Sequence, residues 1–127
     1  MTEPELLLHA MLLVGGADGA LTTGEKALME GHFCTLPELR THDFRDVFQR
    51  AEKLLQATDP VAVLRALSPA AREKAWFLAV DIAMCSGDMH PRTRNMLDAV
   101  KTVLGLDAAL ATKIREVIAL KYVQRVS

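Results

Sequence analysis

Apolar positions along the chain recur at intervals of three and four residues. The clearest series follows His42 and consists of Phe44, Val47, Phe48, Ala51, Leu54 and Leu55. This spacing predicts an amphipathic helix with one face toward a core. The chain lacks the every-second-residue alternation that is typical of a half-buried strand. The pattern therefore predicts an all-α fold.

Two further segments are apolar on every side rather than on one face. Leu6 to Val14 is interrupted only by His9, and Ala75 to Met84 only by Asp81. A helix that is hydrophobic all round is normally surrounded by other helices. We therefore expect these two segments to form the centre of a bundle, with two aromatic residues in its core: Trp76 and Phe77.

Start and stop signals divide the chain into short helices. Thr22 and Glu25 fit a capping box, in which each side chain bonds the backbone N–H of the other residue. Proline near the first helical position gives further starts, and glycine gives a stop. These signals predict a bundle of about seven helices. The start and stop signals lie at Pro37, Pro60, Ser68-Pro69, His90-Pro91, Gly105 and Asp107.

Two loops, Ala17 to Glu25 and Cys85 to Thr93, resemble each other by residue class. Each follows an all-apolar helix and precedes an amphipathic one. A helix–loop–helix unit used twice, related by an approximate two-fold axis, is the simplest interpretation. The first unit covers about residues 4–35 and the second about residues 69–104, within one domain of residues 1–127.

Composition restricts the class of protein. The chain has 127 residues, of which 50% are hydrophobic, enough for a single domain with a real core. Its formal net charge of -1 offers no general attraction to nucleic acid or to anionic membranes. The longest apolar run is far shorter than the ~20 residues that span a bilayer, and no basic segment precedes it. We expect a soluble, cytoplasmic protein with no transmembrane segment.

The first loop matches the second half of a calcium-binding EF-hand. Asp18 takes the fifth position of that motif, Gly19 the sixth and Glu25 the twelfth. The first and third positions fall on Val14 and Gly16, which carry no side-chain oxygen. A hard cation needs about six to eight oxygen ligands, so this loop is not a complete EF-hand.

A partial oxygen site remains, and acids elsewhere in the chain are candidates to complete it. Asp81 interrupts an apolar helix, and Asp88 lies in the second loop. Together with Asp18 and Glu25 they are the predicted ligands of a divalent cation: calcium, magnesium or zinc. The alternative is structural, with Glu25 as a cap, Asp18 as a turn residue and Asp81 as the partner of an Arg, Lys or His. The sequence leaves both interpretations open.

Other candidates for chemistry are weak. None of the four histidines, His9, His32, His42 and His90, has the spacing of a zinc site. His9 and His32 fall on or near apolar faces and suit hydrogen-bonded core positions, and His90 suits a helix cap. Cys34 and Cys85 have no identifiable activating base, and we expect reduced, buried thiols. No nucleophile motif is present, so the sequence predicts a protein that is not an enzyme.

The C-terminal segment is mildly basic. Its cationic residues complement the negative end of the last helix, which is their ordinary role. A docking surface for an acidic partner is the alternative. The residues concerned are Lys113, Arg115, Lys121 and Arg125.

Several motifs in order resemble the TerB tellurite-resistance family. They are Ala17-Asp18-Gly19 with Glu25 six residues later, the second loop, and Met96-Leu97 leading to Leu104-Gly105-Leu106-Asp107. The N-terminal domain of a membrane-anchored DnaJ-type co-chaperone is similar. The resemblance covers essentially the whole chain and implies an all-helical, pseudo-symmetric fold with acidic loops. In the second loop this chain departs from the family, because Ser86 and Thr93 stand where the family has acids.

The resemblance implies a non-enzymatic module in the response to tellurite or other chemical stress. Such a module binds or senses a metal ion and acts through a protein partner, and a homodimer is left open. The alternative function is a small helical enzyme or redox factor that uses Cys34, Cys85 or Asp81.

Overall fold

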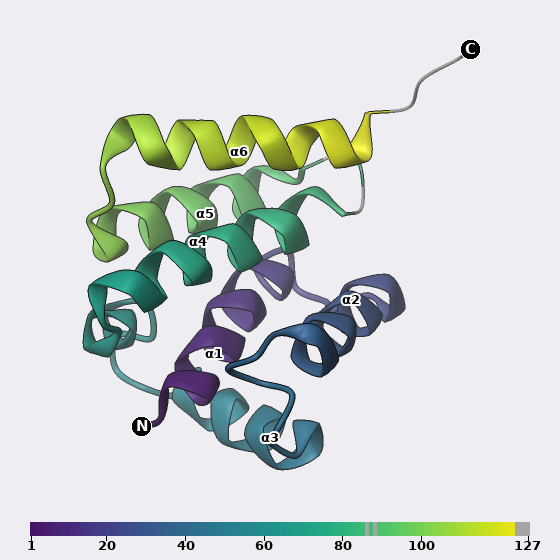
Figure 1. The fold of residues 1–127 in the computed structure, drawn as a ribbon, viewed down its shortest axis with the longest axis vertical. Coiled ribbons are helices and arrows are strands. Elements are labelled where there is room, and N and C mark those ends of the chain that lie inside the picture. Colours follow the sequence, from purple (N-terminus) through teal and green to yellow (C-terminus); the bar gives the residue numbers. More distant parts are fainter. Residues whose placement is uncertain (86, 88, 124–127) are drawn as a thin grey trace.

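The fold consists of six α-helices and one short 3-10 helix (Figure 1). The structure, a computed structural model, describes residues 1–85, 87 and 89–123. Within those residues there is no strand, which confirms the all-α prediction. The elements are α1 (Glu3–Gly15), α2 (Thr23–Thr35), α3 (Phe44–Leu54), η1 (Ala62–Ala66), α4 (Pro69–Met84), α5 (Pro91–Leu104) and α6 (Ala108–Tyr122).

The helices differ from the predicted ones in two places. The short segment after Pro60 forms the 3-10 helix η1 rather than an α-helix. The start signal at Pro37 does not begin a helix, because residues 36–42 form successive turns. Nucleating an α-helix is costly, and segments this short gain too few hydrogen bonds to hold one.

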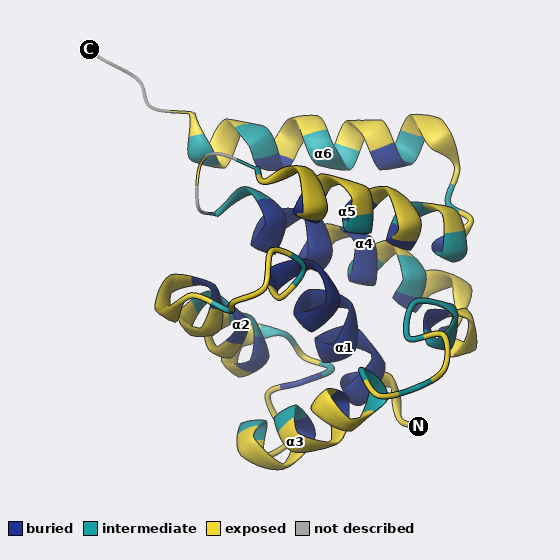
Figure 2. Cartoon of the chain, turned by 180° about the vertical axis from the view of Figure 1, so that it is seen from behind, coloured by how far each residue is buried: buried dark blue, intermediate teal, exposed yellow. Residues whose placement is uncertain are grey.

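Helix α1 is the centre of the molecule (Figure 2). Every residue from Pro4 to Gly15 is buried, and the helix packs against α3, α4 and α5. Each fully buried leucine in such a position contributes roughly 1.5–3 kcal/mol of transfer free energy. The burial of α1 confirms the prediction that the segment from Leu6 to Val14 is surrounded by other helices.

Helix α4 is the second central helix, but one of its aromatic side chains is exposed. Trp76 is 1% exposed, and its Nε1 donates a hydrogen bond to the Ala111 carbonyl of α6 at 3.0 Å. Phe77 was predicted to lie in the core, but it is 41% exposed. The neighbouring helices cover the other sides of α4 and leave the side that carries Phe77 partly open.

The predicted caps are present. Thr22 Oγ1 accepts from the Glu25 N–H at 3.1 Å, and Glu25 Oε1 accepts from the Thr22 N–H at 2.9 Å. Ser68, His90 and Asp107 cap α4, α5 and α6, and each side chain accepts one N–H of the first turn. These bonds satisfy donors that the first turn of a helix leaves without a partner.

The two helix–loop–helix segments agree in their bounds but not in their packing. The loops share a glycine with positive φ, 103° at Gly19 and 88° at Gly87. Helices α4 and α5 pack along their length, whereas α1 and α2 touch at few residues. The two-fold relation between the units therefore stays a prediction.

No described helix has both the length and the apolar character required to cross a bilayer.

Candidate functional site

Asp81 lies at the meeting point of three helices. It is 1% exposed, and its carboxylate accepts hydrogen bonds from groups on α2 and α6. His32 Nε2 lies 2.7 Å from Oδ2, and Lys121 Nζ lies 2.9 Å from Oδ2 and 3.1 Å from Oδ1. The Tyr122 hydroxyl donates to Oδ1. We call Asp81, His32, Lys121 and Tyr122 the Asp81 cluster.

The cluster holds Asp81 in its charged form. Burial by itself raises the pKa of the carboxyl, but the hydrogen bonds from His32, Tyr122 and Lys121 outweigh burial and lower this pKa from 3.8 to about 2. Burial and the nearby carboxylate raise the pKa of Tyr122, so its hydroxyl stays protonated and continues to donate. The arrangement is a compensated buried charge.

The predicted cation ligands are engaged separately within the described residues. Asp18 Oδ1 accepts from the Ala20 N–H at 3.4 Å in its own turn, and Glu25 forms the capping box. The structure places no group of three or more His, Cys, Asp or Glu side chains for a metal among those residues. The fourth predicted ligand, Asp88, lies outside the described residues.

Metal binding therefore remains a prediction, and the geometry states what it requires. An ion that uses Glu25 Oε1 must displace the Thr22 N–H, and an ion that uses Asp81 must displace His32, Lys121 or Tyr122. Calorimetric titration with calcium, magnesium or zinc tests the prediction. If the titration gives no heat of binding and the melting temperature does not change, the prediction is wrong.

His9 occupies a core position, as its sequence context predicted. It is fully buried, and its Nε2 donates to the Pro60 carbonyl at 2.7 Å. Its Nδ1 has no hydrogen-bond partner among the described residues. Burial lowers the pKa of His9, and the nearby carbonyls of Pro60 and Ala51 offset this only in part. A neutral imidazole here joins the centre of α1 to the segment before η1.

The two cysteines differ from the expectation of buried thiols. Both are free, but Cys34 is exposed and Cys85 is half-buried. Burial, followed by the charges of Glu25 and Asp81, raises the pKa of the Cys85 thiol. A raised pKa disfavours the thiolate that a nucleophilic or redox cysteine needs.

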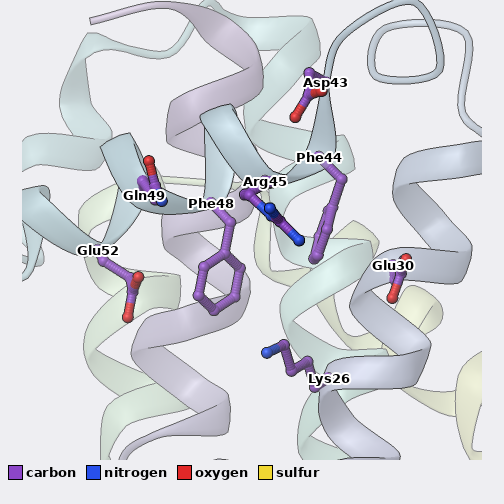
Figure 3. Close-up of a pocket in the computed structure, with 8 residues that line it drawn as sticks. All are labelled: Lys26, Glu30, Asp43, Phe44, Arg45, Phe48, Gln49 and Glu52. Atoms are coloured by element: carbon purple, nitrogen blue, oxygen red, sulfur yellow. The ribbon is translucent and has the colours of Figure 1, made fainter.

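A groove lies between α2 and α3 (Figure 3). Its volume is about 790 Å³, and Phe44 and Phe48 form its floor. The two rings are 5.5 Å apart, and Lys26 Nζ lies 5.4 Å from the centre of the Phe48 ring. The other lining residues are Glu30, Asp43, Arg45, Gln49 and Glu52.

The charged residues around this groove include the N-cap of α3, Asp43, whose Oδ1 accepts from the Asp46 N–H at 3.0 Å. Within the part of the chain that the structure describes, none of them takes part in an ion pair. Lys26 and Arg45 are positively charged, and the other three charged residues are acids. We call this feature the α2–α3 groove.

Sequence reasoning did not find the α2–α3 groove. It assigned Phe44 and Phe48 to the buried face of a helix, and both are half-buried in the structure. The signal that was available is the absence of a matching apolar stripe on α2. Only Met29 and Phe33, besides the capping Glu25, are buried in that helix, so α2 covers α3 incompletely.

The basic residues near the C-terminus lie in different environments. Lys121 belongs to the Asp81 cluster, Lys113 is exposed and Arg115 is half-buried. Arg125 lies outside the described residues.

Comparison of the chain with family models, with curated proteins and with solved structures finds no match. The TerB resemblance therefore rests on the motifs of the sequence alone.

Proposed function

We propose that this chain is a non-enzymatic, TerB-like binding module that acts through a protein partner, and that the partner occupies the α2–α3 groove. The observation that carries the proposal is the groove's composition. Two neighbouring aromatic rings, tilted relative to each other by 49°, form its floor, and charged side chains without ion-pair partners in the described structure surround them. Protein interfaces commonly combine an aromatic centre with a polar rim.

The chemistry of the groove defines the partner segment. An apolar or aromatic side chain packs on Phe48 and Phe44, and flanking charges of both signs meet Lys26 and Glu52. Lys26 sits over the Phe48 ring in the free protein, so binding requires only that this flexible side chain move aside. Aromatic contacts of this kind supply most of the binding free energy in small interfaces.

The titratable groups with shifted pKa values support a binding role over a catalytic one. Asp81 is held by three donors, His9 is buried against Pro60, and Cys85 has a raised pKa. Each therefore serves packing or hydrogen bonding. A role in tellurite or chemical stress follows from the TerB resemblance, and survival of a deletion strain exposed to tellurite tests it.

Selection from a random-peptide library tests the groove directly. We expect peptides with one aromatic residue between charges of opposite sign, and NMR shifts on binding at Lys26, Phe44 and Phe48. Phe48→Ser should weaken binding by about tenfold or more. Phe77→Ser, which removes a half-exposed aromatic ring from another surface, is the matched control and should bind normally. Peptides whose shifts map elsewhere, or no selected peptide, would contradict the proposal.

A further inference from the structure

Helix α6 lies at the edge of the molecule with its outer side uncovered (Figure 1). It packs mainly against α4, and only Ala111 and Ile118 of its residues are buried. Figure 2 shows the helix as largely exposed. Val117 is 56% exposed and Leu120 is 61% exposed. Large exposed apolar side chains grouped on one element are typical of an interaction surface.

An apolar groove runs between α6 and the exposed Phe77 of α4. Its volume is about 270 Å³, and apart from Lys113 all of its lining residues are apolar: Phe77, Leu110, Ile114 and Val117. A second hollow of about 390 Å³ begins on the other side of Phe77 and includes Leu36 and Ala70. Phe77 is therefore a ridge between two hollows. We call this region the α4–α6 surface.

The charges of the α4–α6 surface balance. Lys74 pairs with Glu38 at 2.8 Å, and Lys121 pairs with Asp81. Lys113 and Glu73 are exposed at its borders, and neither forms an ion pair within the described residues. One positive and one negative charge remain, so the surface favours neither a strongly acidic nor a strongly basic partner. It does complement another surface with the same pair of charges.

The apolar positions on α6 also complement themselves. Leu110 precedes Ile114 by four residues and Val117 follows it by three, which places all three on one side of the helix. In an antiparallel pair of α6 helices whose two-fold axis passes between Lys113 and Ile114, Leu110 of one helix lies opposite Val117 of the other. A two-fold interface requires such self-complementarity, because one patch must match its own copy.

We propose that a second copy of this chain covers the α4–α6 surface and forms a two-fold symmetric dimer with antiparallel α6 helices. Phe77 of each copy is the aromatic anchor at the centre, and Lys113 and Glu73 form the charged border. The dimer leaves the α2–α3 groove, on other helices, open to a partner. The inference is independent of the proposed function.

Sedimentation over a range of protein concentrations tests the dimer. We expect the wild-type chain to dimerise, and Val117→Asp to weaken dimerisation by more than about tenfold because it buries a charge without a partner. Thr112→Asp places the same charge on the opposite flank of α6, and Phe48→Ser alters the α2–α3 groove. Both controls should dimerise normally. A wild-type chain that is monomeric at every concentration would overturn the proposal, as would a dimer that Val117→Asp leaves intact.

A cysteine cross-link provides a second measurement that does not require a disruptive variant. In a chain with Cys34→Ser and Cys85→Ser, Ile114→Cys should form a disulfide with its own copy on mild oxidation. Thr112→Cys should not. Cross-linking that is equal at the two positions contradicts the antiparallel arrangement.

Discussion

Lys121 Nζ lies 2.9 Å from Asp81 Oδ2, and this contact fastens the last turn of α6 to the last turn of α4. Lys121 is half-exposed whereas Asp81 is buried, so the cation remains partly hydrated while it neutralises the acid. This asymmetry avoids most of the desolvation cost of a fully buried ion pair.

Asp81→Asn should lower the free energy of unfolding by about 2 kcal/mol, because the charge-assisted hydrogen bonds from Lys121 and His32 are lost. Urea unfolding at neutral pH measures the change. Asp98→Asn on α5 is a matched control, since Asp98 is exposed and forms no ion pair within the described residues. A loss no larger than that of the control contradicts this account.

The stabilisation from Asp81 should depend on acid pH. Its pKa is about 2 in the folded chain and 3.8 as a reference, so the folded state favours the deprotonated form. The contribution is complete above pH 3.8, on the order of 2 kcal/mol, and is lost as the pH falls through about 2. The difference in unfolding free energy between wild type and Asp81→Asn should therefore shrink across that interval. A constant difference would show that the carboxylate charge is not responsible.

His9 should make the fold sensitive to mild acid. Burial lowers its pKa below the ordinary value of 6.5, so the unfolded chain takes up a proton more readily than the folded chain. Stability is complete above that value and decreases as the pH falls below it. His9→Gln removes this dependence while it keeps an N–H for the Pro60 carbonyl. Unfolding free energies of the two proteins at pH values on either side of 6.5 measure the effect, and parallel curves would refute it.

Thr22→Ala should destabilise the fold by about 1 kcal/mol, because the Glu25 N–H loses its acceptor at the start of α2. Thr23→Ala changes the neighbouring residue, which has the same chemistry and is also exposed, and serves as the control. Thermal unfolding of both variants gives the comparison. Equal effects would mean that the capping bond contributes nothing of its own.

Cys34 should react rapidly with a thiol reagent, and Cys85 slowly. Cys34 is exposed, whereas Cys85 is half-buried, donates to the Ile82 carbonyl at 3.2 Å and has a raised pKa. Both should react at one rate in denaturant. A fast Cys85 in the folded chain would revive the redox alternative.

Periodicity and caps made much of the fold predictable. The all-apolar segment before Val14 could only lie at a bundle centre, and the bonds between Thr22 and Glu25 follow from local spacing. Phe77 could not be placed in the same way. Its sequence neighbours are all buried, and its exposure depends on where α2 and α6 lie, which is a tertiary relation.

Dependence on tertiary structure also explains why the site could be predicted only in part. An acid in an apolar helix indicated that Asp81 has a partner, and the structural alternative named Lys and His among the candidates. The identities Lys121 and His32 could not be read from spacing, because both partners come from distant helices. The α2–α3 groove depends on how far two helices separate, a quantity that the pattern of either helix does not contain.

The bond from Trp76 Nε1 to the Ala111 carbonyl gives the protein an optical reporter. Trp76 is the single tryptophan of the chain, and α6 supplies the group that its indole bonds. If α6 separates from α4 before the rest of the bundle unfolds, fluorescence will record that step apart from the helical signal of circular dichroism. The helix that we expect to carry the contact between copies is therefore also the one whose attachment can be followed without a label.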